Sequence, residues 1–188
     1  LIKEHIATAL PVSSGILVEK YAMECSPATV RQRMAELELD GFIIQPHTSA
    51  GRIPTEKAYR LFVENLPESN LKPSESKLFS ELLNNKAEQN LKQAAKALAN
   101  TSGLAVFWAF HERNLYYTGI SNLLKQPEFS RLSRIYDISA IIDQMDEIID
   151  NIYRQINFGK HILIGSESPF GDFCSAILAK YKIGRQSG

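Results

Sequence analysis

The segment 26–40 is a predicted helix with polar and basic side chains on the face opposite its apolar residues. At about 100° per residue, Gln32 lies roughly opposite Val30, Met34 and Leu37. Two small residues and two arginines accompany Gln32, namely Ala28, Thr29, Arg31 and Arg33. Such a helix can enter the major groove of DNA, where an amide contacts an adenine edge and arginines reach the phosphates on either wall. The same pattern also fits a surface helix of mixed charge, and the segment alone leaves both interpretations open.

The polar stretch 45–55 is the second segment that could meet a polyanion. Its sequence is Gln-Pro-His-Thr-Ser-Ala-Gly-Arg-Ile-Pro-Thr, with Gly51 for a tight turn and no acid before Glu56. This composition suits a wing, the hairpin loop that lies beside a recognition helix on DNA. The loop residues that we expect to contact DNA are His47, Thr48, Ser49 and Arg52. Taken alone, the stretch fits an ordinary hairpin loop better, and the wing interpretation depends on the helix before it.

Short helices and a hairpin are expected to position these two segments. Ser26 is a predicted N-cap, followed by a proline that loses nothing at the first helical position. Residues 42–44 and 53–54 are predicted strands, and Thr55 caps a further helix. The apolar residues of the first predicted helix share one face, namely Ile2, Ile6 and Leu10, and Pro11 ends that helix. Three helices, a hairpin and a fourth helix are the order of a winged helix-turn-helix domain, which we assign to residues 1–66.

A second domain follows a predicted linker. Residues 67–77 hold two prolines and three serines and offer little to bury. Beyond them the expected elements are helices around 75–84, 87–99 and 127–155, a turn at 111–114, and strands at 103–110, 115–120, 161–165 and 174–182. We therefore predict an α+β fold. The chain opens inside a predicted helix and ends without a partner for its last strand, so we expect both ends to be cut.

Composition narrows the class of protein. The chain has 188 residues, and Lys+Arg 21 against Asp+Glu 21 gives a formal net charge of zero. A surface that binds anions must then come from local segregation of charge. Two distant cysteines, Cys25 and Cys174, exclude a disulfide scaffold, lack the spacing of zinc ligands and favour a reducing cytoplasm. Without a long apolar run or a signal peptide, we expect a cytoplasmic protein with no membrane partner.

Catalytic and metal-binding patterns are weak. The histidines are scattered and lack ligand spacing: His5, His47, His111 and His161. The stretch 165–171 lacks the lysine of a phosphate-binding loop, and Cys174 fits a buried hydrophobe better than a nucleophile. Four carboxylates fit a solvated helix face better than acid–base chemistry: Asp143, Asp146, Glu147 and Asp150. We predict that the chain is not an enzyme and has no catalytic residue, metal ligand or cofactor.

Several stretches resemble one known family. The runs 26–41 and 46–55, the latter Pro-His-Thr-Ser-Ala-Gly-Arg-Ile-Pro-Thr, are similar to the heat-inducible transcription repressor HrcA family. Segments 117–129 and 164–169, with the strand after the latter, resemble later parts of the same family. The resemblance implies a winged-helix domain joined to a GAF-like α/β domain over residues 78–188. It also implies a repressor of heat-shock genes that binds an inverted-repeat operator upstream of chaperone genes and that a chaperonin helps to keep active.

Three departures from the family pattern bear on these expectations. Gln32 and Arg33 stand where the family has asparagine followed by an acid, so the base preference can differ. Only residues 111–114 fill the place of a long insertion that contributes to dimerisation in the family. A palindromic operator calls for a homodimer, which we then expect to form through the second domain, with the helix 127–155 and the aromatic strand as candidate surfaces. The family continues beyond this chain's last residue, so we expect the second domain to be incomplete.

Two alternatives stay open beside a DNA-binding repressor. The chain could instead be a winged-helix regulator whose second domain senses a small metabolite in a pocket lined by aromatic residues: Phe107, Trp108, Phe110, Tyr116 and Tyr117. Alternating strand positions make core packing the commoner explanation of those residues. A winged helix can also act as a protein–protein scaffold, and a steep salt dependence of DNA binding would separate that case from the first.

Overall fold

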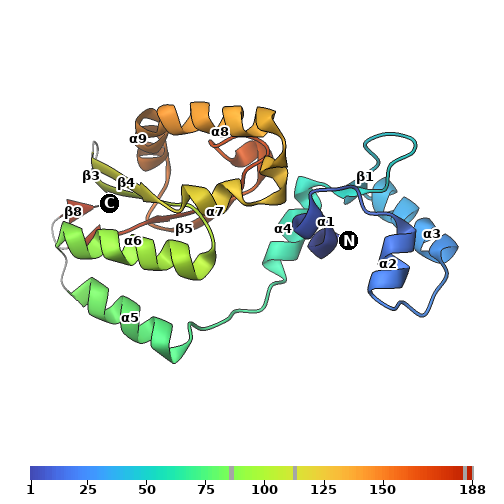
Figure 1. The fold of residues 1–188 in the computed structure, drawn as a ribbon, viewed down its shortest axis with the longest axis horizontal. Helices are drawn as coiled ribbons and strands as arrows, with labels where there is room; N and C mark the ends of the chain where they lie inside the picture. The colour runs from blue at the N-terminus through green and yellow to red at the C-terminus, as the bar shows by residue number, and fades with distance from the viewer. Residues whose placement is uncertain (85–86, 112–113, 184–185, 188) are drawn as a thin grey trace. The chain divides into compact units, whose positions relative to one another are not determined.

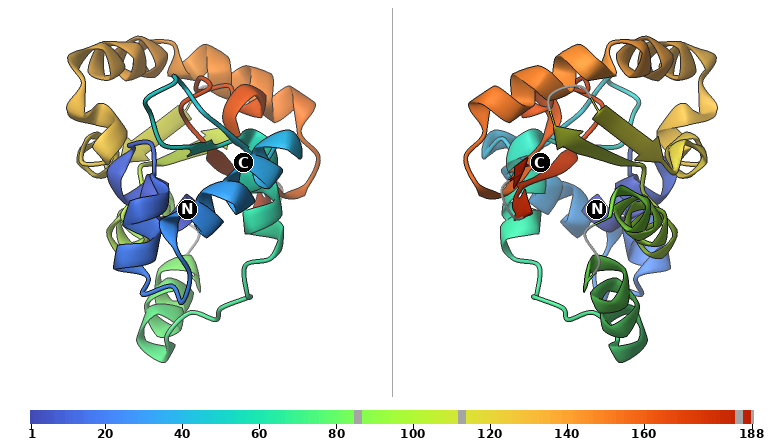
Figure 2. Two further views of the ribbon diagram at one scale, coloured as in Figure 1. Left: turned by 90° about the vertical axis from the view of Figure 1, so that its right-hand side faces the viewer. Right: turned by 90° about the vertical axis from the view of Figure 1, so that its left-hand side faces the viewer.

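The described part of the chain forms an α+β fold, as predicted from the sequence. A computed structural model gives the positions of residues 1–84, 87–111, 114–183 and 186–187. Contacts divide the chain into two compact units, Leu1–Pro67 and Glu68–Gly188, and each is described by itself (Figures 1 and 2). The middle of the turn predicted at 111–114 and three of the last five residues lie outside the described residues.

Short helices and a two-stranded hairpin make up the first unit. They are α1 (Ile2–Thr8), α2 (Ser14–Lys20), α3 (Pro27–Leu39), β1 (Ile43–Ile44), β2 (Ile53–Pro54) and α4 (Glu56–Glu64). Ser13, Ser26 and Thr55 cap α2, α3 and α4, since the oxygen of each side chain accepts a hydrogen bond from a main-chain N–H of the first turn. The caps predicted at Ser26 and Thr55 and the pair of short strands are confirmed.

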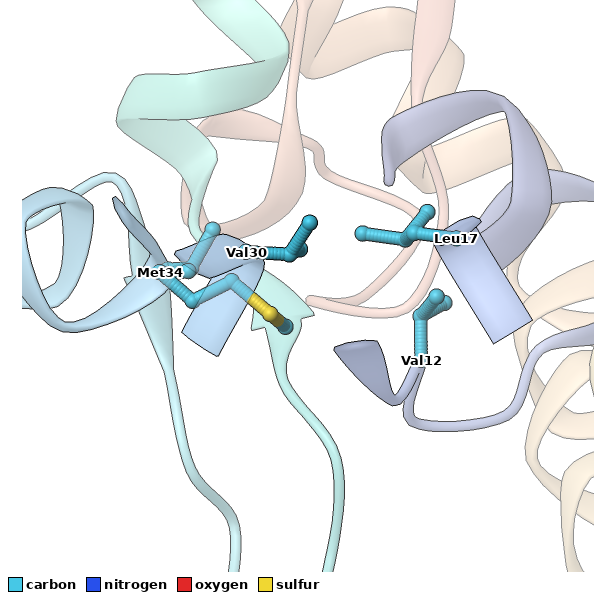
Figure 3. Close-up of a cluster of buried hydrophobic side chains, with 5 residues drawn as sticks. Val12, Leu17, Val30 and Met34 are labelled. Carbon is cyan, nitrogen blue, oxygen red and sulfur yellow. The ribbon is translucent and has the colours of Figure 1, made fainter. Parts of the chain in front are cut away.

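The core of the first unit lies between α2, α3 and β1. Its buried side chains are Val12, Leu17, Val30, Met34 and Ile43. Figure 3 shows that the side chains labelled there converge on a common centre. The prediction that Val30 and Met34 point inward is confirmed. Leu37 is 42% exposed, because it lies almost one turn beyond Met34 and past the end of this cluster.

Helix α1 does not bury the apolar face that the sequence predicted. Ile6 is exposed within α1, and Leu10 is exposed beyond the end of the helix, which Ala9 closes with a φ of 52°. The buried residue of α1 is instead Glu4, whose carboxylate lies 2.7 Å from the Lys20 ammonium. The hydrogen bond from Lys20 lowers the pKa of Glu4, and Glu4 in turn raises the pKa of Lys20. A charged pair therefore joins α1 to α2.

Helices flank paired strands in the second unit. Its elements are α5 (Pro73–Asn84), α6 (Glu88–Ser102), β3 (Val106–His111), β4 (Asn114–Thr118), α7 (Ile120–Leu124), η1 (Pro127–Ser130), α8 (Leu132–Asp143), α9 (Met145–Gln155), β5 (Gly159–Leu163), η2 (Gly165–Glu167), β6 (Ala176–Lys180), β7 (Lys182–Ile183) and β8 (Gln186–Ser187). The strands pair antiparallel as β3–β4, β5–β6 and β7–β8. Helix α6 packs on β3 and β4, and Figures 1 and 2 show α8 and α9 on the other side of the strands.

The linker is shorter than the sequence predicted. Residues 73–77 of the expected linker form the start of α5. A proline fits the first turn of a helix because the missing N–H has no partner there. The Glu75 carboxylate accepts a hydrogen bond from the Lys72 N–H at 2.9 Å, which also favours a helix start at Pro73.

The predicted long helix over 127–155 is wrong, because the chain breaks it twice. A 3₁₀ turn ends before Arg131, and α8 and α9 are separated at Gln144. The backbone angles of Arg131 are extended, and those of Gln144 also leave the helical region. The predicted strand 115–120 is also shorter, since Gly119 adopts a φ of 77° and α7 begins directly after it.

Candidate nucleic-acid interface

The face of α3 opposite the core is exposed over its first turns. The residues that the sequence singled out there are all exposed, namely Ala28, Thr29, Arg31, Gln32 and Arg33. Val30 and Met34 are buried on the other face. Helix α3 thus presents the amide of Gln32 to solvent together with two guanidinium groups.

One of these arginines has an acidic neighbour on the same helix. Arg33 Nη1 lies 2.8 Å from Glu36 Oε2, while the Arg33 side chain stays 75% exposed. The hydrogen bond to Glu36 raises the pKa of Arg33, which keeps the guanidinium charged. Exposed pairs of this kind are weak. A phosphate can therefore replace Glu36 as the partner of Arg33.

The loop 45–52 between β1 and β2 is closed by its own first side chain. The Gln45 amide Nε2 donates hydrogen bonds to the carbonyl oxygens of Thr48 at 2.9 Å and of Ala50 at 3.0 Å. Residues 47–49 are exposed, and Figure 1 shows the loop extending away from the helices of its unit. Gln45 was not among the predicted residues, although an amide at the start of a polar loop is a suitable donor to main-chain carbonyls.

Gly51 allows two segments of the chain to approach each other. A Cβ at this position would overlap the Val12 carbonyl group and lie 2.8 Å from the Ser13 nitrogen. Directly after it, Arg52 and Val12 exchange two main-chain hydrogen bonds of 2.9 Å each. Gly51 directly follows a turn that the Ala50 N–H closes by bonding to the His47 carbonyl, and its φ lies outside the left-handed region. The close contact with Val12, more than the turn, is therefore what requires a glycine here.

Glu38 joins the end of α3 to both ends of the loop. Arg52 Nε donates to Glu38 Oε2 at 2.9 Å, and the Gln45 N–H donates to Glu38 Oε1 at 3.0 Å. The Arg52 side chain is only 17% exposed, so its contact with phosphate stays a prediction while its contact with Glu38 is observed. Sequence reasoning missed Glu38, because its partners lie 7 and 14 residues away along the chain.

Charge is segregated locally in this part of the first unit. Residues 25–35 and 41–55 contain arginines and no acid. Glu36 and Glu38, which lie between these segments, each bind an arginine. These pairs offset part of the local positive charge, so attraction of a polyanion would come from the two acid-free segments.

The aromatic residues of β3 contact neighbouring rings. The Trp108 ring stacks on Phe110 with 6.4 Å between ring centroids, and its indole N–H donates to the Tyr181 hydroxyl. The ring centroids of Phe107 and Tyr117 lie 5.9 Å apart. Burial raises the pKa of Tyr181 to about 12. These aromatic side chains are half-buried, except for Tyr117, which is exposed, and a metabolite pocket in this region stays a prediction.

Among the residues that the structure describes, no three His, Cys, Asp or Glu side chains lie close enough to hold a metal ion together. Of the helices in those same ranges, none combines the length and the apolar character needed to cross a bilayer. Burial raises the pKa of Cys174 to about 11, so this thiol is a poor nucleophile near neutral pH.

Known proteins match this chain over both units. A family model described as HrcA protein C terminal domain matches residues 28–188. The chain belongs to the HrcA family. The resemblance seen in the sequence is thereby confirmed, and the HrcA match includes most of α3, the loop 45–52 and the whole second unit.

Curated HrcA relatives match a smaller part of the chain at higher identity. The "Heat-inducible transcription repressor HrcA" of Beutenbergia cavernae is 55% identical over 73 residues, which cover 39% of this chain and 20% of the relative. The protein of the same name from Alkaliphilus metalliredigens is 46% identical over 103 residues, 53% of this chain and 30% of the relative. That of Chloroflexus aggregans is 54% identical over 79 residues, 42% of this chain and 21% of the relative. The chain therefore matches between a fifth and a third of the length of these HrcA proteins.

A solved structure shares the fold of this HrcA chain. It is described as the crystal structure of a hypothetical protein at 2.2 Å resolution. The two structures superpose with a TM-score of 0.59 over 98% of this chain and 84% of the other, at 19% sequence identity. At this identity the match supports the α+β architecture alone.

Proposed function

We propose that this chain is the DNA-binding part of a heat-inducible transcription repressor, with residues 1–66 as a winged helix-turn-helix domain. Helix α3 is the recognition helix, and the loop 45–52 is the wing. The observation that carries the proposal is the exposed face of α3, which holds no acid over residues 27–35, beside a loop that Glu38 ties to the same helix. The names of the HrcA relatives support the class of function.

Gln32 is the residue of α3 that reads a base. Its amide has both a donor and an acceptor, and it can bond an adenine edge in the major groove through both. Ala28 and Thr29 are small and exposed at the start of α3, so they let the helix approach the bases. The N-terminal half of a recognition helix is the part that such domains insert into the groove.

Backbone contacts come from the arginines of α3 and from the loop. Arg31 and Arg33 flank Gln32 in the sequence and are exposed, so they reach the phosphates on the two walls of the groove. The exposed residues His47, Thr48 and Ser49 meet the neighbouring backbone or the minor groove. These contacts position the domain and carry little sequence information.

Operator symmetry requires two copies of the chain. An inverted-repeat operator matches a two-fold symmetric homodimer, and we propose that residues 78–188, as a GAF-like domain, form it. Helices α8 and α9 and the aromatic strand β3 are the candidate surfaces. A cytoplasmic location and a chaperonin as regulatory partner are further parts of the proposal, and both rest on the family.

Selection of bound duplexes from a random pool, made with the full chain, tests the proposal. The pool should converge on two inverted half-sites whose centres lie about one helical turn, or a multiple of it, apart. Affinity for the selected duplex should fall steeply as salt rises. A pool without enrichment, or binding that ignores salt, would remove DNA recognition as the function.

A further inference from the structure

We infer that Glu38 is a positioning residue that sets the wing against the recognition helix and thereby determines sequence preference. The inference rests on the proposed function and adds to it a residue that touches no DNA. One oxygen of the Glu38 carboxylate accepts from the Arg52 Nε and the other from the Gln45 N–H. Two points near the start and the end of the loop are thus held by one side chain of α3.

Main-chain hydrogen bonds hold the loop to other parts of the first unit. The strands β1 and β2 pair over two residue pairs, Ile43 with Pro54 and Ile44 with Ile53. The main chain of Arg52 bonds to Val12, which lies before α2. Glu38 adds the side-chain link from α3 to the loop. Without it the loop keeps its attachment to the unit but loses its fixed position relative to α3.

Recognition of one base sequence depends strongly on the position of the loop relative to α3. General attraction to DNA depends on that position less. Hydrogen bonds between the Gln32 amide and a base edge are directional and weaken steeply when misaligned. Charge attraction between arginine and phosphate falls off slowly with distance. A loop that tilts freely can still attract DNA, but it no longer holds α3 in one register over the bases.

The charge of Glu38 makes the two effects separable. The Glu38 side chain is 33% exposed beside the proposed interface, and a carboxylate there repels DNA of any sequence. Pairing with Arg52 offsets this repulsion. Replacing the carboxylate by an amide should therefore leave or raise affinity for arbitrary DNA while it lowers the preference for one sequence. A purely structural defect would lower both affinities together.

The test compares Glu38→Gln with Glu64→Gln in the full chain. Both changes remove one negative charge, and Glu64 is an exposed residue in the last turn of α4. The probes are the duplex that the wild-type chain selects from a random pool and a scrambled duplex of the same composition. We expect Glu38→Gln to lower the ratio of the two affinities about tenfold and Glu64→Gln to change it by less than about twofold.

A second variant keeps the test decisive if Glu38→Gln does not fold. Arg52→Met removes the Nε donor that binds Glu38, and Arg52 is not part of the buried core, so this variant should fold and lower the ratio in the same way. Combining Glu38→Gln with Arg52→Met should lower the ratio no further than either change alone, because the two residues act as one pair.

The possible outcomes distinguish a failure of the inference about Glu38 from a failure of the proposed function. An unchanged ratio in Glu38→Gln and Arg52→Met overturns the inference and leaves DNA recognition standing. An equal loss of affinity for both duplexes assigns Glu38 to stability alone and also overturns it. If the wild-type chain enriches no duplex, the proposed function fails, and the inference fails with it.

Discussion

Gly51 packs against the main chain of Val12 so closely that a methyl group on its α-carbon would overlap the Val12 carbonyl. The two hydrogen bonds between Val12 and Arg52 follow directly after this contact. Val12 is itself the most deeply buried large side chain among the described residues. The end of the loop, just before β2, is therefore held against the core of the first unit.

Gly51→Ala should lower the free energy of unfolding of the first unit by about 1–3 kcal/mol, because the new methyl group must push two main chains apart. Urea unfolding of the variant and the wild type measures the loss. Gly15→Ala in α2 is the matched control, since its Cβ would meet only Ser13 Oγ, at 3.8 Å. That control should be neutral or gain up to about 1 kcal/mol. Equal stability of Gly51→Ala and the wild type would contradict the close contact.

Gln32→Ala and Arg31→Ala should have different effects on DNA binding. Loss of the amide should cost about 1–3 kcal/mol on the selected duplex and relax the choice of one base per half-site. Loss of the arginine should weaken all duplexes similarly and lower the slope of log affinity against log salt by roughly one unit. Titrations of selected and scrambled duplexes at several salt concentrations give both quantities.

The control for these two variants is Lys3→Ala, because Lys3 is an exposed lysine of α1 outside the proposed interface. It should leave both the salt slope and the base preference unchanged. If Gln32→Ala weakens the selected and the scrambled duplex equally, the groove placement of α3 is wrong.

The Glu4–Lys20 pair should make the stability of the first unit depend on pH in the acid range. The Glu4 carboxylate also accepts a hydrogen bond from the Tyr21 hydroxyl at 3.3 Å, which lowers the pKa of Glu4 further below its ordinary value of 4.5. A lowered pKa means that the stabilisation is complete above 4.5 and is lost as pH falls through the folded-state value. Melting temperatures of wild type and Glu4→Gln between about pH 3 and 7 should therefore converge toward the acid end. A constant difference across that range would show that the charge of Glu4 contributes nothing.

Cys174 should react slowly with alkylating reagents in the folded chain. Burial and the negative charge of Glu128 raise the pKa of its thiol to about 11, so little reactive thiolate exists at neutral pH. Iodoacetamide labelling of a Cys25→Ser variant, followed by mass spectrometry, measures the rate for Cys174 alone. The rate should rise at least about tenfold when the chain is unfolded in urea. Equal rates in both states would place the thiol in solvent.

Local signals predicted the helix starts of the first unit well. The caps at Ser26 and Thr55 depend on bonds to the third residue after each, a spacing that the sequence displays directly. The inward face of α3 also followed from helical periodicity, as far as Met34. The prediction of burial was wrong for Leu37 and Leu10. Packing partners that are distant in sequence decide where a small core ends and where a helix stops.

The contacts that organise the candidate site were beyond sequence reasoning. In the sequence Glu38 is one acid near the end of a predicted helix, and its two partners come close only when the hairpin folds back on α3. The sequence also shows no partner for Arg52, because Glu38 lies 14 residues before it. No glycine or proline marks the helix breaks at Arg131 and Gln144. The apolar periodicity continues across both positions, so the sequence predicted a single helix.

The bonds of Gln45 bear on the entropy of binding. A polar loop that is unstructured in the free protein loses conformational freedom when it settles on a ligand, at a cost of about 1–2 kcal/mol for each residue whose backbone is fixed. Here the amide of Gln45 spans the loop through Thr48 and Ala50, and the Ala50 N–H bonds to the His47 carbonyl. Much of that ordering is completed during folding, so free energy from contacts at the tip of the loop remains available for association.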